Sequence, residues 1–192
     1  MIEIVSLDDP ETLMPVGKRG EICVRGPQVM AGYWNQPDET LAAFQGGRLH
    51  TGDVGYIDEE GYVFLIDRIK DLILNAGFNV YPRMVEEAIH LHPAVEDTVV
   101  AGVPDKNRGE VVKAYVKLRP GQELKPGELK RFLKDKLAPY EQPKRIEFRD
   151  ELPVTYIGKH SRRDLVAEEV RRLNEGLPPV DDEPEEAQAV QS

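Results

Sequence analysis

The stretch Asp67-Arg68-Ile69-Lys70-Asp71 (DRIKD) separates two parts of the chain that differ in pattern. Apolar runs flank it, Tyr62–Ile66 on one side and Leu72–Leu74 on the other. Four charged residues in five are hard to bury inside one strand. Taken alone, such a pentapeptide is a surface turn with a solvated salt bridge. The alternative is a hinge, because hinges are a few residues at the ends of elements that absorb changes in φ and ψ.

The part before this stretch, residues 1–66, has the pattern of short β-strands joined by tight turns. The segments that predict strands are Ile2–Leu7, Glu21–Arg25, Val54–Ile57 and Tyr62–Ile66. The last two flank a turn that contains Gly61 and predict a β-hairpin. A short helix is expected at Thr40–Phe44. Several short strands with regular turns and no long helix are typical of part of a small barrel.

The part after the stretch, residues 71–175, has the pattern of a compact α+β domain. The predicted strands are Leu72–Leu74, Val95–Val103, Val111–Leu118 and Arg145–Arg149. The predicted helices begin at Pro82, span Pro126–Leu137, and follow the cap residue Ser161 to about Gly176. Asn75–Asn79 predicts a loop. Three helices on a small mixed sheet form a domain of about 100 residues, a common domain size.

The composition excludes some classes of partner. The chain has 35 acidic and 25 basic residues, a formal net charge of −10, which argues against nucleic acid or an anionic membrane as the main partner. Residues 176–192 are acidic and poor in large apolar side chains, which predicts a disordered tail. No apolar run reaches transmembrane length and no signal peptide is evident, so a cytoplasmic protein is expected.

Cysteine and histidine usage points to neither a disulfide nor a metal. Cys23 is the only cysteine, so an internal disulfide is impossible and a reducing compartment is expected. Between Gly20 and Gly26, Cys23 is expected to be a small buried hydrophobe rather than a nucleophile. The histidines, at positions 50, 90, 92 and 160, lack metal-ligand spacing, and no metal site is predicted.

Several separated motifs occur in one order along the chain. They are Gly32-Tyr33-Trp34-Asn35-Gln36-Pro37, His50-Thr51-Gly52-Asp53, Asp67-Arg68-Ile69-Lys70-Asp71, Gly77-Phe78-Asn79-Val80-Tyr81-Pro82, Gly102-Val103-Pro104-Asp105 and Thr155-Tyr156-Ile157-Gly158-Lys159. Each motif alone is short, but the ordered set resembles the adenylate-forming superfamily of acyl-CoA synthetases, luciferases and nonribosomal peptide adenylation domains. Within it, the resemblance is strongest to bacterial fatty-acid–CoA ligases. It covers about residues 17–172.

The resemblance implies a domain organisation and a reaction. Residues 1–66 would end a large N-terminal domain as its β subdomain, 67–70 would be the hinge, and 71–175 the mobile C-terminal AMP-binding domain. Such enzymes use ATP with Mg²⁺ to convert a small-molecule carboxylic acid into an acyl-adenylate, and then transfer the acyl group to coenzyme A (CoA). The family's phosphate loop and acyl pocket lie upstream, and the 192 residues contain no Gly-rich phosphate cradle. A fragment or shortened reading frame is therefore expected, inactive without the missing N-terminal domain and without the Mg²⁺ ligands.

Lys159 is the candidate catalytic residue. The matching lysine in the family bridges the substrate carboxylate and a phosphate oxygen during adenylation, a task that suits a compact charge on a long stem. Gly158 before it allows close approach to a ligand. A lone lysine is usually a solvated surface residue, and only the motif favours the catalytic role. His160-Ser161 replaces an apolar pair common in these ligases, which leaves the packing beneath the loop open.

Asp53 and Arg68 are the candidate nucleotide-binding residues. Asp53 is expected to end a turn, where its carboxylate can accept hydrogen bonds from both ribose hydroxyls. Without the resemblance, a turn-capping Asp is the better interpretation. Arg68 resembles the arginine beside the hinge that reaches the same ribose; its alternative is an ion pair with Asp67. Lys70 matches the hinge position, where the family carries Asp or Lys.

Gly77 matches the glycine that lines the pantetheine tunnel of CoA in the thioester-forming arrangement, and Phe78 and Asn79 are further candidates for that wall. The plain alternative for Gly77 is a turn glycine.

Two other functions stay open. One is a fragment of a peptide-synthetase adenylation domain, although the acidic tail in place of a carrier domain favours free CoA as acceptor. The other is a free-standing binding module without catalysis.

Overall fold

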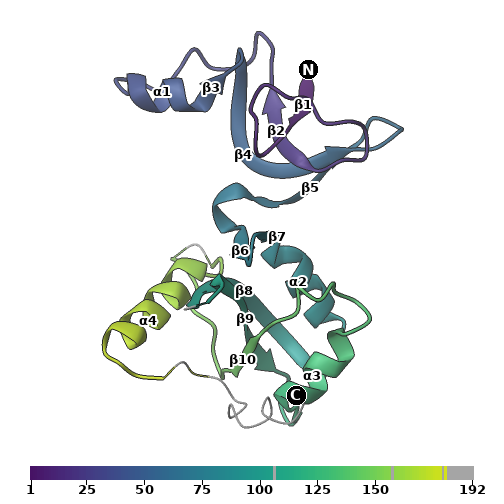
Figure 1. Ribbon diagram of the computed structural model, residues 1–192, viewed down its shortest axis with the longest axis vertical. Helices are drawn as coiled ribbons and strands as arrows, with labels where there is room; N and C mark the ends of the chain where they lie inside the picture. The colour runs from purple at the N-terminus through teal and green to yellow at the C-terminus, as the bar shows by residue number, and fades with distance from the viewer. Residues whose placement is uncertain (106, 157, 179, 181–192) are drawn as a thin grey trace. The chain divides into compact units, whose positions relative to one another are not determined.

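The computed structural model describes residues 1–105, 107–156, 158–178 and 180 (Figure 1). The chain divides into two compact units, unit 1 (Met1–Lys70) and unit 2 (Asp71–Ser192). The division falls within the DRIKD stretch, at the position predicted to be a hinge, and the hinge itself stays a prediction. Of the tail predicted to be disordered, residues 179 and 181–192 lie outside the described residues.

Unit 1 is a curled, five-stranded antiparallel sheet with one short helix. Its elements are β1 (Ile2–Val5), β2 (Gly20–Val24), α1 (Pro37–Ala43), β3 (Phe44–Gln45), β4 (Arg48–Ile57) and β5 (Val63–Arg68). The strand order is β1-β2-β4-β3, and β5 also pairs with β4. Figure 1 shows β4 bending strongly along its length, which curls the sheet. The prediction of a barrel-like β subdomain is confirmed.

The long strand β4 is the main difference from expectation in unit 1. His50–Asp53 lies within β4, so the predicted turn ending at Asp53 is wrong. Polar residues and Gly52 resemble a turn locally, but pairing with β2 and β5 satisfies the backbone of this segment. The ladder accommodates Gly52 at φ +73° and a register shift between Val54 and Gly55.

Within its described residues, unit 2 is a mixed sheet with three helices. Its elements are β6 (Ile73–Asn75), β7 (Phe78–Val80), α2 (Pro82–His90), β8 (Val95–Asp105), β9 (Gly109–Leu118), α3 (Pro126–Leu133), β10 (Arg145–Phe148) and α4 (Arg162–Asn174). A 3-10 turn, η1 (Ile69–Asp71), precedes β6. The strand order is β10-β9-β6-β7, with β8 also on β9; the β9–β10 pair is parallel and the other described pairs of this sheet are antiparallel. No helix in the described part of the chain is long and apolar enough to cross a membrane.

The sheet of unit 2 is covered on both faces, and its two cores follow the alternation of its central strands. Val100 of β8 and Ala114 of β9 belong to the core beneath α2 and α3. The alternate residues Val99 and Tyr115 pack with Leu165 of α4. Figure 1 shows α4 on one side of the sheet and α2 and α3 on the other. The predicted compact α+β domain is confirmed.

Two boundaries in unit 2 differ from the sequence pattern. Asn75–Asn79 is a tight hairpin rather than a loop, in which Ala76 (φ +51°) and Gly77 (φ +86°) form the two-residue turn between β6 and β7. The first strand of this hairpin, β6, was expected at Leu72–Leu74, whereas the three-residue strand β7 carries too little alternation to be recognised from sequence. Helix α3 ends at Leu133, because the chain beyond it turns before Leu137. The Ser161 cap of α4 is confirmed, since its side chain accepts a hydrogen bond from the Asp164 N–H.

Candidate functional site

Asp53 and Arg68 lie opposite each other on neighbouring strands of unit 1. They are register partners of β4 and β5, and Arg68 Nε donates to Asp53 Oδ1 at 2.9 Å. The side chain of Asp53 is 32% exposed and that of Arg68 is 53% exposed, so a ligand can reach both. Arg68 therefore pairs with Asp53, whereas Asp67 accepts a hydrogen bond from the backbone N–H of Arg68 at 2.9 Å. The structure brings the two predicted nucleotide-binding residues together.

Two side chains that the sequence pattern did not single out hold the backbone before Asp53. Glu21 accepts hydrogen bonds from His50 Nδ1 at 2.7 Å and from the Gly52 N–H at 2.9 Å. The Thr51 hydroxyl donates to the Ile22 carbonyl at 2.7 Å and accepts from the Asp53 N–H at 3.1 Å. These contacts depend on the register between β2 and β4, which no local signal reveals. They hold the backbone from which the Asp53 side chain extends.

Glu21 and His50 lie beside Cys23, the only cysteine of the chain, and these residues form the Glu21 cluster. Cys23 Sγ lies 3.4 Å from His50 Nδ1, and potential ligand atoms of Glu21, Cys23 and His50 lie within 4.8 Å of one another. Such a set is chemically suited to a metal ion. Burial, with the charge of Glu21 adding to it, raises the pKa of the Cys23 thiol to about 12. His50 Nδ1 lies within hydrogen-bond distance of both Glu21 Oε2 and Cys23 Sγ. The expectation that the chain has no metal site stays a prediction.

Because Cys23 is buried in unit 1, the reactivity of its thiol tests this description of unit 1 directly. The side chain is fully buried, as predicted for a small hydrophobe. At pH 8 the folded chain is expected to resist alkylation by iodoacetamide, because the thiol is both inaccessible and protonated. In urea the same thiol should react within minutes, so intact mass measured with and without urea separates the two states. Rapid labelling of the folded chain would contradict this description of unit 1.

Lys159 lies at the base of a small hairpin-like loop in unit 2. The Thr155 N–H donates to the Lys159 carbonyl at 2.6 Å, and the Lys159 N–H donates to the Thr155 hydroxyl at 3.2 Å. Gly158 has φ +76°, and a Cβ there would meet nothing within 4 Å. The Lys159 side chain is exposed, and within the described ranges its ammonium has no ion pair. The ammonium is thus available to a ligand.

The base of this loop is attached to three other elements. His160 Nε2 lies 3.0 Å from Asp97 Oδ2 of β8. Arg162 binds Glu86 of α2 through both carboxylate oxygens at 2.7 and 2.8 Å, and Asp71 of η1 at 3.6 Å. His160 and Ser161 stand where an apolar pair was expected. Both have polar roles here, because His160 pairs with Asp97 and Ser161 caps α4. None of these partners could be found without the fold.

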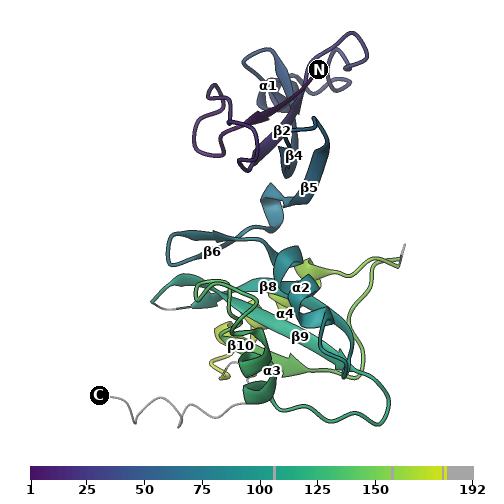
Figure 2. The ribbon, with the colours of Figure 1, turned by 90° about the vertical axis from the view of Figure 1, so that its right-hand side faces the viewer.

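Gly77 lies at the turn of the β6–β7 hairpin, which projects from the margin of unit 2 with its turn pointing outward (Figure 2). A Cβ on Gly77 would meet nothing within 4 Å, so the space above the turn is open. Phe78 and Asn79 beside it are exposed. Lys70, the predicted hinge residue, is exposed within η1. Lys159 and Gly77 therefore lie on separate loops of the same unit.

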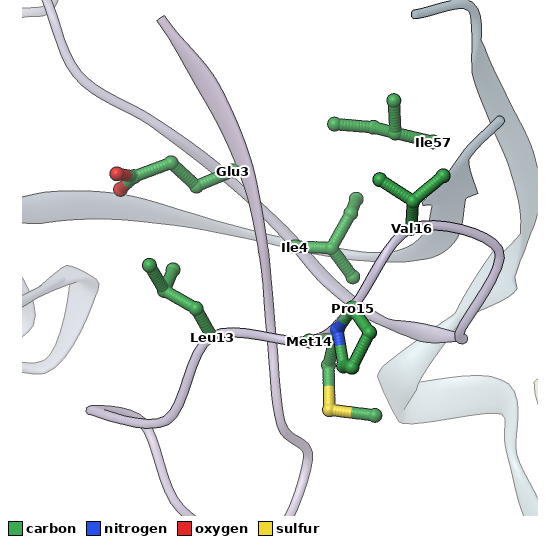
Figure 3. Close-up of a pocket in the computed structure, with 7 residues that line it drawn as sticks. All are labelled: Glu3, Ile4, Leu13, Met14, Pro15, Val16 and Ile57. Atoms are coloured by element: carbon green, nitrogen blue, oxygen red, sulfur yellow. The ribbon is translucent and has the colours of Figure 1, made fainter. Parts of the chain in front are cut away.

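One apolar pocket of about 170 Å³ lies elsewhere in unit 1 (Figure 3). Its lining residues are Glu3, Ile4, Leu13, Met14, Pro15, Val16 and Ile57. The carboxylate of Glu3 is already bound by Arg48 at 2.7 Å and by Arg25 at 3.1 Å, and the Arg48 hydrogen bond lowers its pKa. The pocket contains none of the predicted site residues, and its lining offers no reactive group.

Comparison with known proteins gives consistent matches. Residues 84–159 match the family model of the AMP-binding enzyme C-terminal domain. The chain is 55% identical over 152 residues to a long-chain-fatty-acid–CoA ligase of Bacillus subtilis (strain 168), covering 79% of this chain and 27% of that protein. It is 47% identical over 152 residues to the fatty acid–[acyl-carrier-protein] ligase ScoC of Streptomyces coeruleorubidus, covering 79% of this chain and 29% of that protein.

A solved structure extends the match to the fold. The crystal structure of ATP-bound MatB from Rhodopseudomonas palustris aligns with a TM-score of 0.81 and 36% identity, covering 88% of this chain and 33% of that one. The chain thus spans less than a third of the length of the curated relatives described above.

Proposed function

The chain belongs to the AMP-binding, adenylate-forming enzymes and contains their C-terminal domain, and from this premise we propose that it serves an ATP-dependent fatty-acid–CoA ligase. The observation that carries the proposal is that unit 2 presents two different exposed loops. One ends in Lys159, whose ammonium is unpaired among the described residues, and the other is the open glycine turn at Gly77. Each suits one half of a two-step acyl transfer, in which an acyl-adenylate forms first and a thiol then takes the acyl group.

Lys159 is proposed to act in the first half-reaction. A carboxylate oxygen of the acid attacks the α-phosphorus of ATP, the bond to pyrophosphate breaks, and negative charge builds up on the phosphate oxygens. A positioned ammonium stabilises that charge and orients the attacking carboxylate. The hydrogen bonds between Thr155 and Lys159 fix the backbone from which this side chain extends. The long stem then allows the ammonium to reach a ligand bound outside unit 2.

Asp53 and Arg68 are proposed to bind the nucleotide ribose. A carboxylate accepts hydrogen bonds from two neighbouring hydroxyls, and the exposed edge of Asp53 is free for this. Arg68 orients Asp53 through its 2.9 Å ion pair and offers further donors to the ribose oxygens. ATP is used with Mg²⁺, and none of the residues assigned here is proposed as its ligand.

Gly77 is proposed to act in the second half-reaction, in which the CoA thiol attacks the acyl carbonyl and AMP leaves. The pantetheine arm needs a narrow passage, and the open space above Gly77 is where a Cβ would intrude. Phe78 and Asn79 would form the adjoining wall. Rotation about Lys70 would present first the Lys159 loop and then the Gly77 turn to the same acyl-adenylate.

A chimera provides the test. The part of the Bacillus subtilis ligase that precedes the aligned region would be joined to this chain, whose 55% identity favours a compatible interface. We expect it to form palmitoyl-AMP and palmitoyl-CoA from palmitate, ATP and CoA, detected by chromatography, whereas the 192-residue chain alone forms neither. A chimera that folds cooperatively but makes no adenylate would contradict the proposal, as would ligase turnover by this chain alone.

A carrier protein is the second candidate acceptor, because one relative at 47% identity is named a fatty acid–[acyl-carrier-protein] ligase. Both acceptors present the same phosphopantetheine thiol, so the Gly77 turn suits either. Offering the adenylated chimera equal concentrations of CoA and of a phosphopantetheinylated carrier protein distinguishes them. We expect CoA to accept the acyl group faster.

A further inference from the structure

Tyr140, in the loop after α3, contacts both ends of the β6–β7 turn. Its backbone carbonyl accepts a hydrogen bond from Asn75 Nδ2 at 2.7 Å, and Asn75 is almost fully buried at the entry of the turn. Its ring stacks on that of Phe78 at the exit, with centroids 4.7 Å apart and planes 13° from parallel. A single residue thus binds the last residue before the turn and the first residue after it.

The turn needs such support. Ala76 and Gly77 both adopt the left-handed region, which is disfavoured for the alanine. The start of β9 and the residue before it hold the entry side, because the Ala76 N–H donates to the Arg108 carbonyl at 3.3 Å and the Leu74 N–H donates to Glu110 Oε2 at 3.0 Å. Both contacts reach only residues before Gly77. On the exit side, the Tyr140 ring is the contact that the structure describes for the Phe78 side chain.

The loop that carries Tyr140 is itself anchored to α3. Gln142 Nε2 donates to the carbonyls of Leu133 and Leu137, each at 3.0 Å. The Ala138 N–H donates to Glu141 Oε2 at 2.8 Å, which closes the segment on itself. Helix α3 packs in the main core of unit 2, so the loop attached to it is held in place, and Tyr140 with it.

We propose that Tyr140 is a positioning residue for the thioester-forming half-reaction, acting by holding the Gly77 turn in the shape that admits pantetheine. This inference rests on the proposed function, since it concerns the same turn. Tyr140 need not touch the substrate, because its carbonyl and ring act through Asn75 and Phe78. Loss of the ring should loosen the exit of the turn and leave Lys159, on another loop, undisturbed.

The first experiment needs no enzymatic activity. Amide hydrogen exchange, followed by NMR in the 192-residue chain, should accelerate about tenfold across residues 78–80 in Tyr140→Ala, the scale of one lost aromatic pair. Tyr140→Phe should exchange as the wild type does, since it keeps both the ring and the carbonyl. Tyr33→Ala, which removes an exposed ring from unit 1, is the matched control and should leave these amides unchanged. Unaltered exchange in Tyr140→Ala, or equal acceleration throughout unit 2, would overturn the proposal.

The second experiment measures the two half-reactions in the chimera. Tyr140→Ala should lower the rate of acyl transfer to CoA about tenfold and change adenylation less than twofold, and Tyr140→Phe should restore the transfer rate. Equal effects on both half-reactions, or none on transfer, would overturn the positioning role. A wild-type chimera that makes no adenylate would instead refute the proposed function, and the exchange data would still decide whether Tyr140 holds the turn.

Discussion

Lys159→Ala is expected to slow acyl-adenylate formation in the chimera by roughly 10²-fold or more, the scale of removing one electrostatic stabiliser from an active site. The ammonium is the only charged group on its loop between Thr155 and Lys159, and it has no ion pair among the described residues. Its removal should therefore subtract charge stabilisation without breaking a structural contact. Transfer of a preformed acyl-adenylate to CoA should be nearly unchanged, because that step is assigned to the Gly77 turn.

Two assays separate these steps. Pyrophosphate release reports adenylation, and a single turnover started from preformed acyl-adenylate reports transfer to CoA. Lys134→Ala is the matched control, because it removes another exposed lysine of unit 2. A loss of equal size in both half-reactions would refute the division of labour between the two loops, and a control as slow as Lys159→Ala would show a general charge effect.

Lys113→Ala is expected to have the largest effect on stability, lowering the free energy of unfolding by roughly 3–5 kcal/mol. Lys113 lies on β9 and is fully buried beneath α4. Its ammonium is 2.7 Å from Glu147 Oε2 of β10 and also contacts Glu169 of α4 directly. Both carboxylates are themselves buried. Glu147 keeps its ion pair with Arg149 at 2.6 Å, so removing the cation leaves Glu169 as a buried charge without its Lys113 partner and close to a like charge, which is worse than losing one favourable pair.

Urea unfolding of the 192-residue chain measures this effect. Lys113→Met combined with Glu147→Gln and Glu169→Gln removes every charge of the triad and should recover much of the loss, since an apolar replacement of a buried ion pair is often neutral. Lys117→Ala is the matched control on the same strand, because its pair with Glu96 is exposed, and it should change stability far less. A loss from Lys113→Ala no larger than that of the control would mean that α4 is held by its apolar contacts alone.

The sequence predicts those features that local periodicity determines. The runs of β-forming residues at Val95–Val103 and Val111–Leu118 predict the central strands, and the residue type and position of Ser161 predict a helix cap. The burial of Cys23 followed from its apolar neighbours. These features depend on neighbours within one turn or two strand positions, so the pattern carries the information.

Features that depend on strand register and on distant partners could not be predicted. His50–Asp53 has the composition of a turn, and only the pairing of β4 with β2 and β5 makes it part of a ladder. Lys113 interrupts an apolar run, which signals something unusual, but Glu169 lies 56 residues away. The contact of Tyr140 with Phe78 likewise joins positions with no local relation. The candidate residues could be chosen from the family motifs in the sequence, whereas the contacts that support them could be found only in the folded structure.

The central claim is that unit 2 swivels about Lys70 to present Lys159 and Gly77 in turn. Lys70→Pro in the chimera tests it most directly, because proline fixes φ near −65° and restricts the preceding residue, whereas the control Lys70→Ala leaves the backbone free. With both rates measured, the account predicts that Lys70→Pro keeps one half-reaction and loses the other, while Lys70→Ala keeps both. If a folded Lys70→Pro chimera retained both rates, the swivel at Lys70 would be contradicted.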